Sequence, residues 1–353
     1  MKKLILIMSL MFLVACQSEP SGPAMQVIER IDKDDYQMLF PFKASPVRNY
    51  HGIYLGRTDF MEIGSRLEAK SKEHFSPEEY YLAEGQVLTN ALLIQLVRRE
   101  STDNPYGLNP PKDSNFLIGT SDISVKDAVV VANVVEINFH IEENNEYPLA
   151  GMALAIVLNQ NLRTDNGFVT ITEQVLYDYG TNMGRKLDRF IRGLTDLENI
   201  PLFIALYVTN PLDAVLPGRF IGSGYFTARG GQFTKDDEVW ALLPSTQATS
   251  LNAKLAEQFN QIKSDLTIFT PEAVGVIGEA RFVNQQVDFL RLTLTLQAKT
   301  YTEIKGLAQH TATLIKEIDN RDYPIVVRIN SISETLVLME LTVDDELNII
   351  YTY

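Results

Sequence analysis

The sequence has 353 residues, the length of about two ordinary domains. Hydrophobic residues make up 45% of it and charged residues 22%, a balance that excludes a mainly disordered chain and a polytopic membrane protein. The formal net charge is −14, and so acidic a chain is not expected to bind nucleic acid. A single Cys rules out disulfide frameworks and cysteine-based zinc sites.

The N-terminus has the pattern of an export signal. Lys2 and Lys3 precede twelve apolar or small residues, 4–15, and Cys16 follows directly. Twelve residues of helix span only about 18 Å, whereas a bilayer core is roughly 30 Å thick. A permanent transmembrane anchor is therefore not predicted.

The end of this run, Leu13-Val14-Ala15-Cys16, resembles the bacterial lipobox. The resemblance implies that the Cys16 thiol takes a diacylglyceryl group and that signal peptidase II cuts between Ala15 and Cys16. Two or more acyl chains hold a protein stably on a bilayer. We expect a signal peptide at 1–15, a lipidated tether at 16–33 and a body held at the outer face of the cell membrane. A plain secretory signal with a chance Cys is the alternative.

Residues 34–243 are predicted to form an N-terminal α+β domain. The pattern Ser76-Pro77-Glu78-Glu79 is typical of a helix start, and Thr89 is a second candidate cap. In the strand 129–141, Glu136 is expected on a polar, solvent-facing side. The expected helices are 60–72, 89–99 and 171–194, and the expected strands are 129–141, 149–158, 201–208 and 219–227.

The polar stretch 244–250 is the predicted domain boundary, and 251–353 is the predicted C-terminal α+β domain. Its expected helices are 251–263 and 301–318, and its expected strands are 274–283, 287–298, 324–329, 336–341 and 348–353. Each half contains a strand, a long helix and a strand opened by Pro, which leaves an internal duplication open. The predicted fold class is α+β, with two domains of helices packed on mostly antiparallel sheets.

Short motifs along the chain resemble the CamS family of Gram-positive lipoproteins, which are described as precursors of the sex pheromone cAM373. The resemblance covers nearly the whole mature chain in order. The residues that carry it are Phe40-Pro41-Phe42-Lys43-Ala44-Ser45-Pro46-Val47-Arg48, Glu84-Gly85-Gln86-Val87-Leu88-Thr89, Tyr106-Gly107-Leu108-Asn109-Pro110, Ile277-Gly278-Glu279-Ala280-Arg281-Phe282 and Tyr301-Thr302-Glu303.

The resemblance implies that the named activity belongs to the discarded signal peptide. In that family, further proteolysis gives a hydrophobic heptapeptide that ends just before the lipidated Cys. The same register here gives residues 9–15, Ser9-Leu10-Met11-Phe12-Leu13-Val14-Ala15, which differs from the family's peptide at several places. An uncharged peptide of this kind can enter an apolar receptor groove without burying side-chain charge.

Three arginines are a candidate contact surface. Arg185, Arg189 and Arg192 project from the side of the predicted helix 171–194 that is opposite its apolar stripe. Contact with anionic lipid headgroups or a wall polymer is one interpretation. A solvated helix face with i,i+4 ion pairs, to Asp178 or Asp188, is the other.

Familiar catalytic and metal-binding patterns are missing, so neither a metal nor a cofactor is expected. The four histidines, His51, His74, His140 and His310, lack helical metal spacing. The segments 222–224 and 180–186 only superficially resemble a nucleophile elbow and a phosphate loop, and the acidic residues of 142–146 lack the order of a calcium loop.

We therefore expect a membrane-anchored surface lipoprotein with a non-catalytic body that binds a peptide or a cell-wall polymer. The alternative is an exported cell-wall hydrolase that works through paired carboxylates, for which Asp236, Asp237 and Glu238 are the candidate acids.

Overall fold

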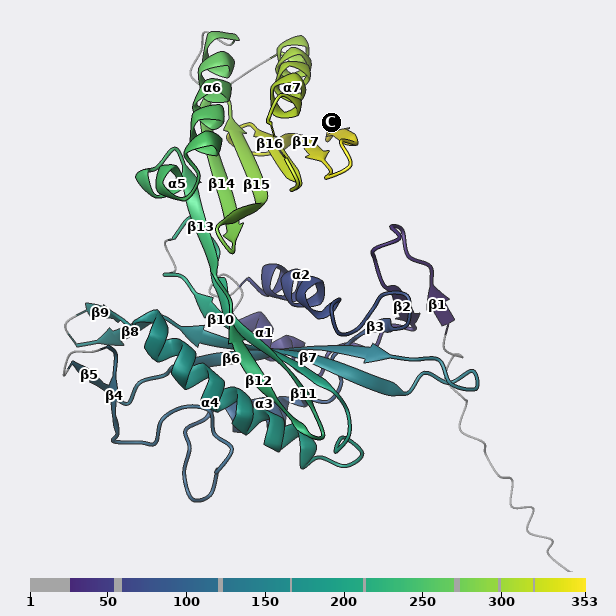
Figure 1. Ribbon diagram of the computed structural model, residues 1–353, viewed down its shortest axis with the longest axis vertical. Coiled ribbons are helices and arrows are strands. Elements are labelled where there is room, and N and C mark those ends of the chain that lie inside the picture. Colours follow the sequence, from purple (N-terminus) through teal and green to yellow (C-terminus); the bar gives the residue numbers. More distant parts are fainter. Residues whose placement is uncertain are drawn as a thin grey trace, which may run out of the picture.

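The computed structural model describes residues 26–53, 59–119, 123–165, 167–211, 214–269, 274–297, 300–319 and 321–353 (Figure 1). The signal peptide, Ala15, Cys16 and the heptapeptide 9–15 lie outside these ranges. Within the described ranges, no helix is both long and apolar enough to cross a bilayer.

The first lobe is built on an eight-stranded sheet. From one edge to the other, its strands are β1 (Gln26–Ile28), β2 (Gln37–Phe40), β3 (Tyr81–Glu84), β6 (Val131–His140), β7 (Leu149–Asn159), β10 (Leu202–Thr209), β11 (Arg219–Thr227) and β12 (Gly230–Lys235). Two short hairpins lie outside it, β4 (Asn115–Leu117) with β5 (Ser124–Lys126) and β8 (Asn161–Thr164) with β9 (Gly167–Thr170). The predicted tether 16–33 is wrong at its end, because residues 26–28 pair with β2.

Helices cover both faces of this sheet. The helices are α1 (Arg48–Ile53), α2 (Phe60–Ser71), α3 (Asn90–Val97) and α4 (Glu173–Arg192). Ile63 and Leu67 of α2 belong to the core on one face, and the buried residues of α3 and α4 belong to the core on the other. The first lobe therefore has three layers (Figure 1).

Local sequence explains where these helices begin and how closely they pack. The side chains of Asp59 and Thr89 accept hydrogen bonds from the first turns of α2 and α3, as N-caps do. In α4, a Cβ on Gly184 would lie 2.2 Å from the Phe233 ring, so only glycine allows this approach. The predicted helices at 60–72, 89–99 and 171–194 are confirmed to within a few residues.

The helix predicted to start at Ser76 is wrong. The chain makes a single turn, in which the backbone N–H groups of Glu79 and Tyr80 donate to the Ser76 carbonyl. It then enters β3, where Tyr81 pairs with His140 of β6. Tertiary pairing of the aromatic residues outweighs the local helix signal.

The strand expected at 129–141 exists as β6, but its polar side does not face solvent. Asn133, Glu136 and Asn138 are all buried. The reason is that the sheet is covered on both faces, which a single strand's alternation does not reveal.

Glu136 is a buried anchor for the loop that follows β3. Its Oε1 accepts hydrogen bonds from the backbone N–H groups of Gln86 and Val87, at 3.1 and 2.9 Å, and its Oε2 accepts one from Leu88 at 2.7 Å. A Cβ on Gly85 would clash with the Glu136 side chain at 2.8 Å. The carboxylate thus sets the conformation of the chain that leads into α3.

The second lobe is a six-stranded sheet with helices on one face. In order, its strands are β13 (Glu238–Leu243), β14 (Gly275–Val283), β15 (Gln286–Thr295), β16 (Ile325–Asn330), β17 (Thr335–Leu341) and β18 (Leu347–Tyr351). The helices are α5 (Thr246–Leu251), α6 (Ala253–Phe269) and α7 (Tyr301–Lys316). Their apolar residues and the inward side chains of the strands form one core.

The change from one sheet to the other comes earlier than the predicted boundary at 244–250. Residues 238–243 form β13, which pairs with β14 and so belongs to the second sheet. The polar stretch itself forms most of α5, whose N-cap is Ser245. The lobes therefore join at residues 236–237, between β12 and β13.

The two sheets share one topology. Six consecutive strands of the first sheet, β3-β6-β7-β10-β11-β12, have one parallel pair, β7 with β10, and all other pairs among them are antiparallel. The second sheet has the same arrangement, with β15 and β16 as its parallel pair. In each sheet a long helix, α4 or α7, lies in the crossover between the parallel strands. The α+β class, with mostly antiparallel sheets, is confirmed.

The Glu136 anchor gives a stability prediction. In Glu136→Gln, an amide N–H₂ replaces one carboxylate oxygen and faces a backbone donor, so a buried N–H loses its acceptor. We expect the free energy of unfolding to fall by about 2–3 kcal/mol. Denaturant titration of the variant and of Glu143→Gln, an exposed control, measures it. Equal stability of the two variants would contradict the role given to Glu136.

Candidate functional site

Six side chains stack alternately where the two lobes meet and along the second sheet. We call this row the arginine–aromatic ladder: Phe220, Arg66, Trp240, Arg281, Phe289 and Arg291. Successive guanidinium-to-ring-centroid distances are 5.0, 5.9, 5.6, 5.6 and 5.4 Å. At these distances each guanidinium carbon lies within the range of an attractive cation–π contact with its neighbouring rings.

Strand register places most of the ladder on one face of the second sheet. Trp240 of β13 pairs with Arg281 of β14, and Arg281 pairs with Phe289 of β15. Paired residues point to the same side of a sheet. Because the flanking residues Ala280 and Phe282 belong to the core beneath the helices, the ladder lies on the face that the helices leave uncovered.

Each arginine of the ladder also has a carboxylate partner. Arg281 contacts Asp288 at 2.5 Å, and Arg291 contacts Glu279 at 2.9 Å. Alternating rings, guanidinium groups and carboxylates form a flat surface that is apolar on the ring faces and polar between them. Such a surface can stack against a planar or ring-shaped ligand and hydrogen-bond its oxygens.

The ladder is closed at one end and open at the other. Phe220 and Trp240 are buried, with exposed fractions of 0% and 5%, whereas the side chains of Arg281 and Arg291 are 20% and 22% exposed. Trp240 Nε1 and Arg291 Nε are buried donors for which the described residues supply no acceptor. Unsatisfied buried donors are costly, so an acceptor from a ligand or water would stabilise both.

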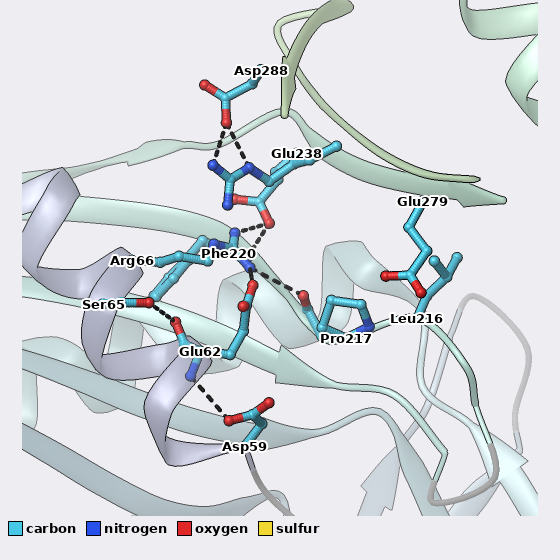
Figure 2. A network of polar contacts seen from close by, with 12 residues as sticks. Asp59, Glu62, Ser65, Arg66, Leu216, Pro217, Phe220, Glu238, Glu279 and Asp288 are labelled. Carbon is cyan, nitrogen blue, oxygen red and sulfur yellow. Dashed lines mark hydrogen bonds and ion pairs between the residues drawn. The ribbon is translucent and has the colours of Figure 1, made fainter. Parts of the chain in front are cut away.

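At the closed end, Arg66 of α2 ties the lobes together (Figure 2). One of its guanidinium nitrogens lies 3.1 Å from Glu62 and 3.3 Å from the Gly218 carbonyl, and another contacts Glu238 at the start of β13. Burial raises the pKa of Glu238, and the positive charge of Arg66 opposes this shift. The buried pair joins the first lobe to the first residue of the second sheet.

Two further contacts reinforce this junction. Lys70 of α2 lies 3.0 Å from Asp236, and the Asn284 N–H in the β14–β15 turn donates to the Asp237 carbonyl at 2.9 Å. The first holds the segment 236–237 to the first lobe, and the second holds it to the second lobe. The relative placement of the lobes therefore depends on a small polar cluster around Arg66.

The structure gives the three predicted arginines of α4 different environments. Arg185 and Arg189 are exposed. The Arg192 guanidinium is committed to the fold: it contacts Asp188 at 2.8 Å and donates to the carbonyls of Glu198, Ile200 and Phe226. The predicted cationic surface thus loses Arg192 and keeps two members.

The predicted acids of a hydrolase are not arranged as an acid–base pair. Glu238 is buried against Arg66, Asp236 lies beside Lys70, and Asp237 is exposed. Of the three, Glu238 is buried, with an exposed fraction of 6%. The two carboxylates that do share a site, Glu62 and Glu238, share one guanidinium.

The four histidines are packed against other groups of the fold. His51, His74 and His310 stack on Phe60, Tyr225 and Phe269, and His140 Nδ1 lies 2.9 Å from the Tyr147 carbonyl. Among the described residues, no group of His, Cys, Asp or Glu is arranged to hold a metal ion.

Gly222 and Gly224 lie in β11, where added Cβ atoms would strike Tyr177 and the Gln232 carbonyl. Their close packing confirms the interpretation of 222–224 as a strand.

Sequence reasoning missed the ladder. Its residues come from α2, β11, β13, β14 and β15, and β13 itself was not predicted. One signal in the sequence could have indicated it. Glu279 and Arg281 are two positions apart on β14, as are Phe289 and Arg291 on β15, so each pair lies on one face of its strand. The motif 277–282 contains both β14 residues, although the sequence alone did not indicate their partners.

Removal of Arg66 should destabilise the protein strongly. Arg66→Ala leaves Glu238 buried without its cation, and breaking a buried pair costs about 3–5 kcal/mol. Denaturant unfolding measures the loss, and small-angle scattering reports any change in the placement of the lobes. Arg185→Ala, an exposed arginine on α4, is the control. If both variants unfold at the same denaturant concentration, the Arg66 contacts do not hold the junction.

Comparisons with known proteins give the relatives of this fold. A crystal structure of a sex pheromone precursor from Lactobacillus salivarius subsp. salivarius UCC118 matches with a TM-score of 0.79 and 23% identity, covering 94% of this chain and 99% of that one. The C-terminal domain of the sex pheromone staph-cAM373 precursor from Staphylococcus aureus matches with a TM-score of 0.67 and 20% identity, covering 81% and 94%. At these identities the two structures show a common fold.

No curated protein matches the chain. The family model described as CamS sex pheromone cAM373 precursor matches residues 42–346. This range contains both sheets apart from β1, β2 and β18, and it confirms the resemblance seen in the sequence motifs. The chain therefore belongs to the CamS sex pheromone cAM373 precursor family.

Proposed function

We propose that this protein is a surface lipoprotein whose Cys16 carries a diacylglyceryl anchor after signal peptidase II has cut behind Ala15. The support is the run Leu13-Val14-Ala15-Cys16 behind a short apolar segment, together with membership of the CamS family. The only Cys of the chain stands at the one position where this chemistry needs a sulfur nucleophile. The body is then held at the outer face of the cell membrane.

The discarded signal peptide supplies a second product in this proposal. Proteolysis of the released segment yields the heptapeptide 9–15, which contains no charged side chain. The description of the family as a pheromone precursor supports this step. Peptide and body thus have separate roles and separate fates.

The folded body acts as a binding module. The observation that carries this part is the open end of the arginine–aromatic ladder, where Arg281, Phe289 and Arg291 form a half-buried surface on the uncovered face of the second sheet. Its flat rings suit sugar rings, and its guanidinium groups suit hydroxyl or carboxylate oxygens. We propose a cell-wall polymer as the ligand, since the anchor places the body next to the wall.

The carboxylates of this region support binding and not hydrolysis. Glu238, Asp288 and Glu279 each neutralise an arginine of the ladder. A general acid needs a proton at working pH and free access to the leaving group. Carboxylates held by guanidinium groups are poorly suited to that task.

The anchor is tested by Cys16→Ser. We expect wild-type protein in the membrane fraction to start at Cys16 and to carry the mass of acyl chains, and we expect the variant to lack that mass and to retain residues 1–15. Because cleavage by signal peptidase II follows lipidation, release of the peptide 9–15 should stop as well. Intact-mass analysis of membranes and peptide mass spectrometry of the medium measure both effects. Ser18→Ala is the control, and a Cys16→Ser variant that still carries acyl mass or still releases the peptide 9–15 would overturn the proposal.

The binding surface is tested by Phe289→Ala. Loss of this ring removes the surface between Arg281 and Arg291, and we expect the affinity for purified cell wall to fall by about tenfold. Co-sedimentation with protein-free wall fragments measures it. Phe168→Ala is the matched control, because Phe168 is 73% exposed on the β8–β9 hairpin of the first lobe. Equal sedimentation of the two variants would show that the ladder is not the binding surface.

A further inference from the structure

An exposed apolar tip lies at the edge of the first sheet. Ile28, Phe40 and Phe42 are 42%, 40% and 60% exposed, and the rings of Phe40 and Phe42 are 5.8 Å apart in an edge-to-face arrangement. We call these three residues the aromatic tip. Single exposed apolar residues are ordinary, but a clustered pair of phenylalanines next to an exposed isoleucine needs a partner.

Strand register places the tip beside the start of the folded body. Gln26, the first residue that the structure describes, pairs with Phe40, and Ile28 pairs with Met38 two positions along. Ile28 and Phe40 therefore lie on the same face of the paired strands β1 and β2. The chain leads from Cys16 to this point, so whatever holds Cys16 lies close to the tip.

The length of the chain between anchor and tip sets a distance. Ten residue steps separate Cys16 from Gln26. Fully extended, they reach at most about 35 Å, and as a flexible coil they span roughly 18 Å. With Cys16 in the bilayer, the tip stays within contact range of the membrane surface.

The tip is firmly placed by the fold. Phe40 ends β2, which pairs with β1 on one side and β3 on the other. Soon after Phe42 the chain is fixed again, because Val47 is buried, with an exposed fraction of 3%. Two rings held in advance lose little conformational freedom on insertion, which favours binding.

The local charge does not oppose contact with a membrane. Residues 26–53 contain four acidic and four basic residues, whereas the whole chain has a net charge of −14. Lys43, directly after Phe42, is exposed. Anionic headgroups therefore repel this end of the body less than the rest, and a lysine beside buried rings can remain at the headgroup level.

We propose that the aromatic tip inserts into the interfacial region of the lipid bilayer and so fixes how the body stands on the membrane. Phenylalanine rings bury apolar area there, and Phe is among the residues that interfacial segments bury at the headgroup–acyl boundary. The proposal rests on the lipid anchor at Cys16, which brings the tip to the surface. It adds a second, non-covalent contact to that anchor.

The test uses the sole cysteine. The chain from Cys16 to its end is coupled through that thiol to maleimide lipids in vesicles of phosphatidylcholine and phosphatidylglycerol, half of them with brominated acyl chains. In Phe42→Trp we expect bromine to quench about half of the added fluorescence, since the ring enters the acyl boundary. Phe168→Trp, a matched exposed site, should not be quenched, and Trp240, which is 5% exposed, gives the background.

A second measurement needs no coupling. The same chain carrying Cys16→Ser should partition into these vesicles about five- to tenfold less when Phe40→Ser and Phe42→Ser are added, and Phe168→Ser should have no effect. Equal quenching at 42 and 168, or unchanged partition of the double variant, would overturn the proposal. Chemical coupling keeps this result independent of whether cells acylate Cys16.

Discussion

The contact of the Arg66 guanidinium with Glu238 is the constraint on which the arrangement of the two lobes depends. Both groups are nearly buried, and burial of charge is costly unless every charge is paired and hydrogen-bonded. Glu62, the Gly218 carbonyl and the Phe220 ring complete the surroundings of the guanidinium. The same strand that brings Glu238 to Arg66 places Trp240 two residues later on the open face of the second sheet. The geometry of the ladder thus follows from the ion pair at its closed end.

The two sheets show how one topology can serve two purposes. Each contains six consecutive strands with one parallel pair at their centre and a long helix in its crossover, yet only the first sheet is covered on both faces. In the first sheet a polar side chain such as Glu136 must find backbone partners inside the protein. In the second sheet Arg281 and Arg291 can lie at a half-exposed surface. Half-exposed polar and aromatic groups are therefore found on the second sheet, while the buried polar groups of the first hold loops in place.

The sequence allowed good predictions where a segment buries one continuous stripe. The apolar spacing of α4 and the cap at Thr89 act locally, so their boundaries could be predicted closely. Predictions failed where a second layer decides the environment. Glu136 alternates with apolar residues like any solvent-facing side chain, and only α3 and the loop before it make its position buried. Likewise, no residue near 238–243 indicates that this segment pairs with β14, about 40 residues later in the chain. The predicted domain boundary therefore follows β13, whereas the structural boundary precedes it.

Three of the motifs behind the family resemblance lie in the first lobe, between the aromatic tip and the ladder. Asn109 joins two segments of the first lobe, since its side chain bonds the backbone of Val97, Val130 and Val131, and the segment 84–89 is the loop that Glu136 holds. The first motif begins at Phe40, within the aromatic tip. In the first sheet, β2 and β11 are five strand spacings apart, about 24 Å at 4.8 Å each. A body standing on its tip would therefore hold Phe220 and the ladder well away from the bilayer. That separation is what a tethered protein needs if its ligand is the wall and not the lipid.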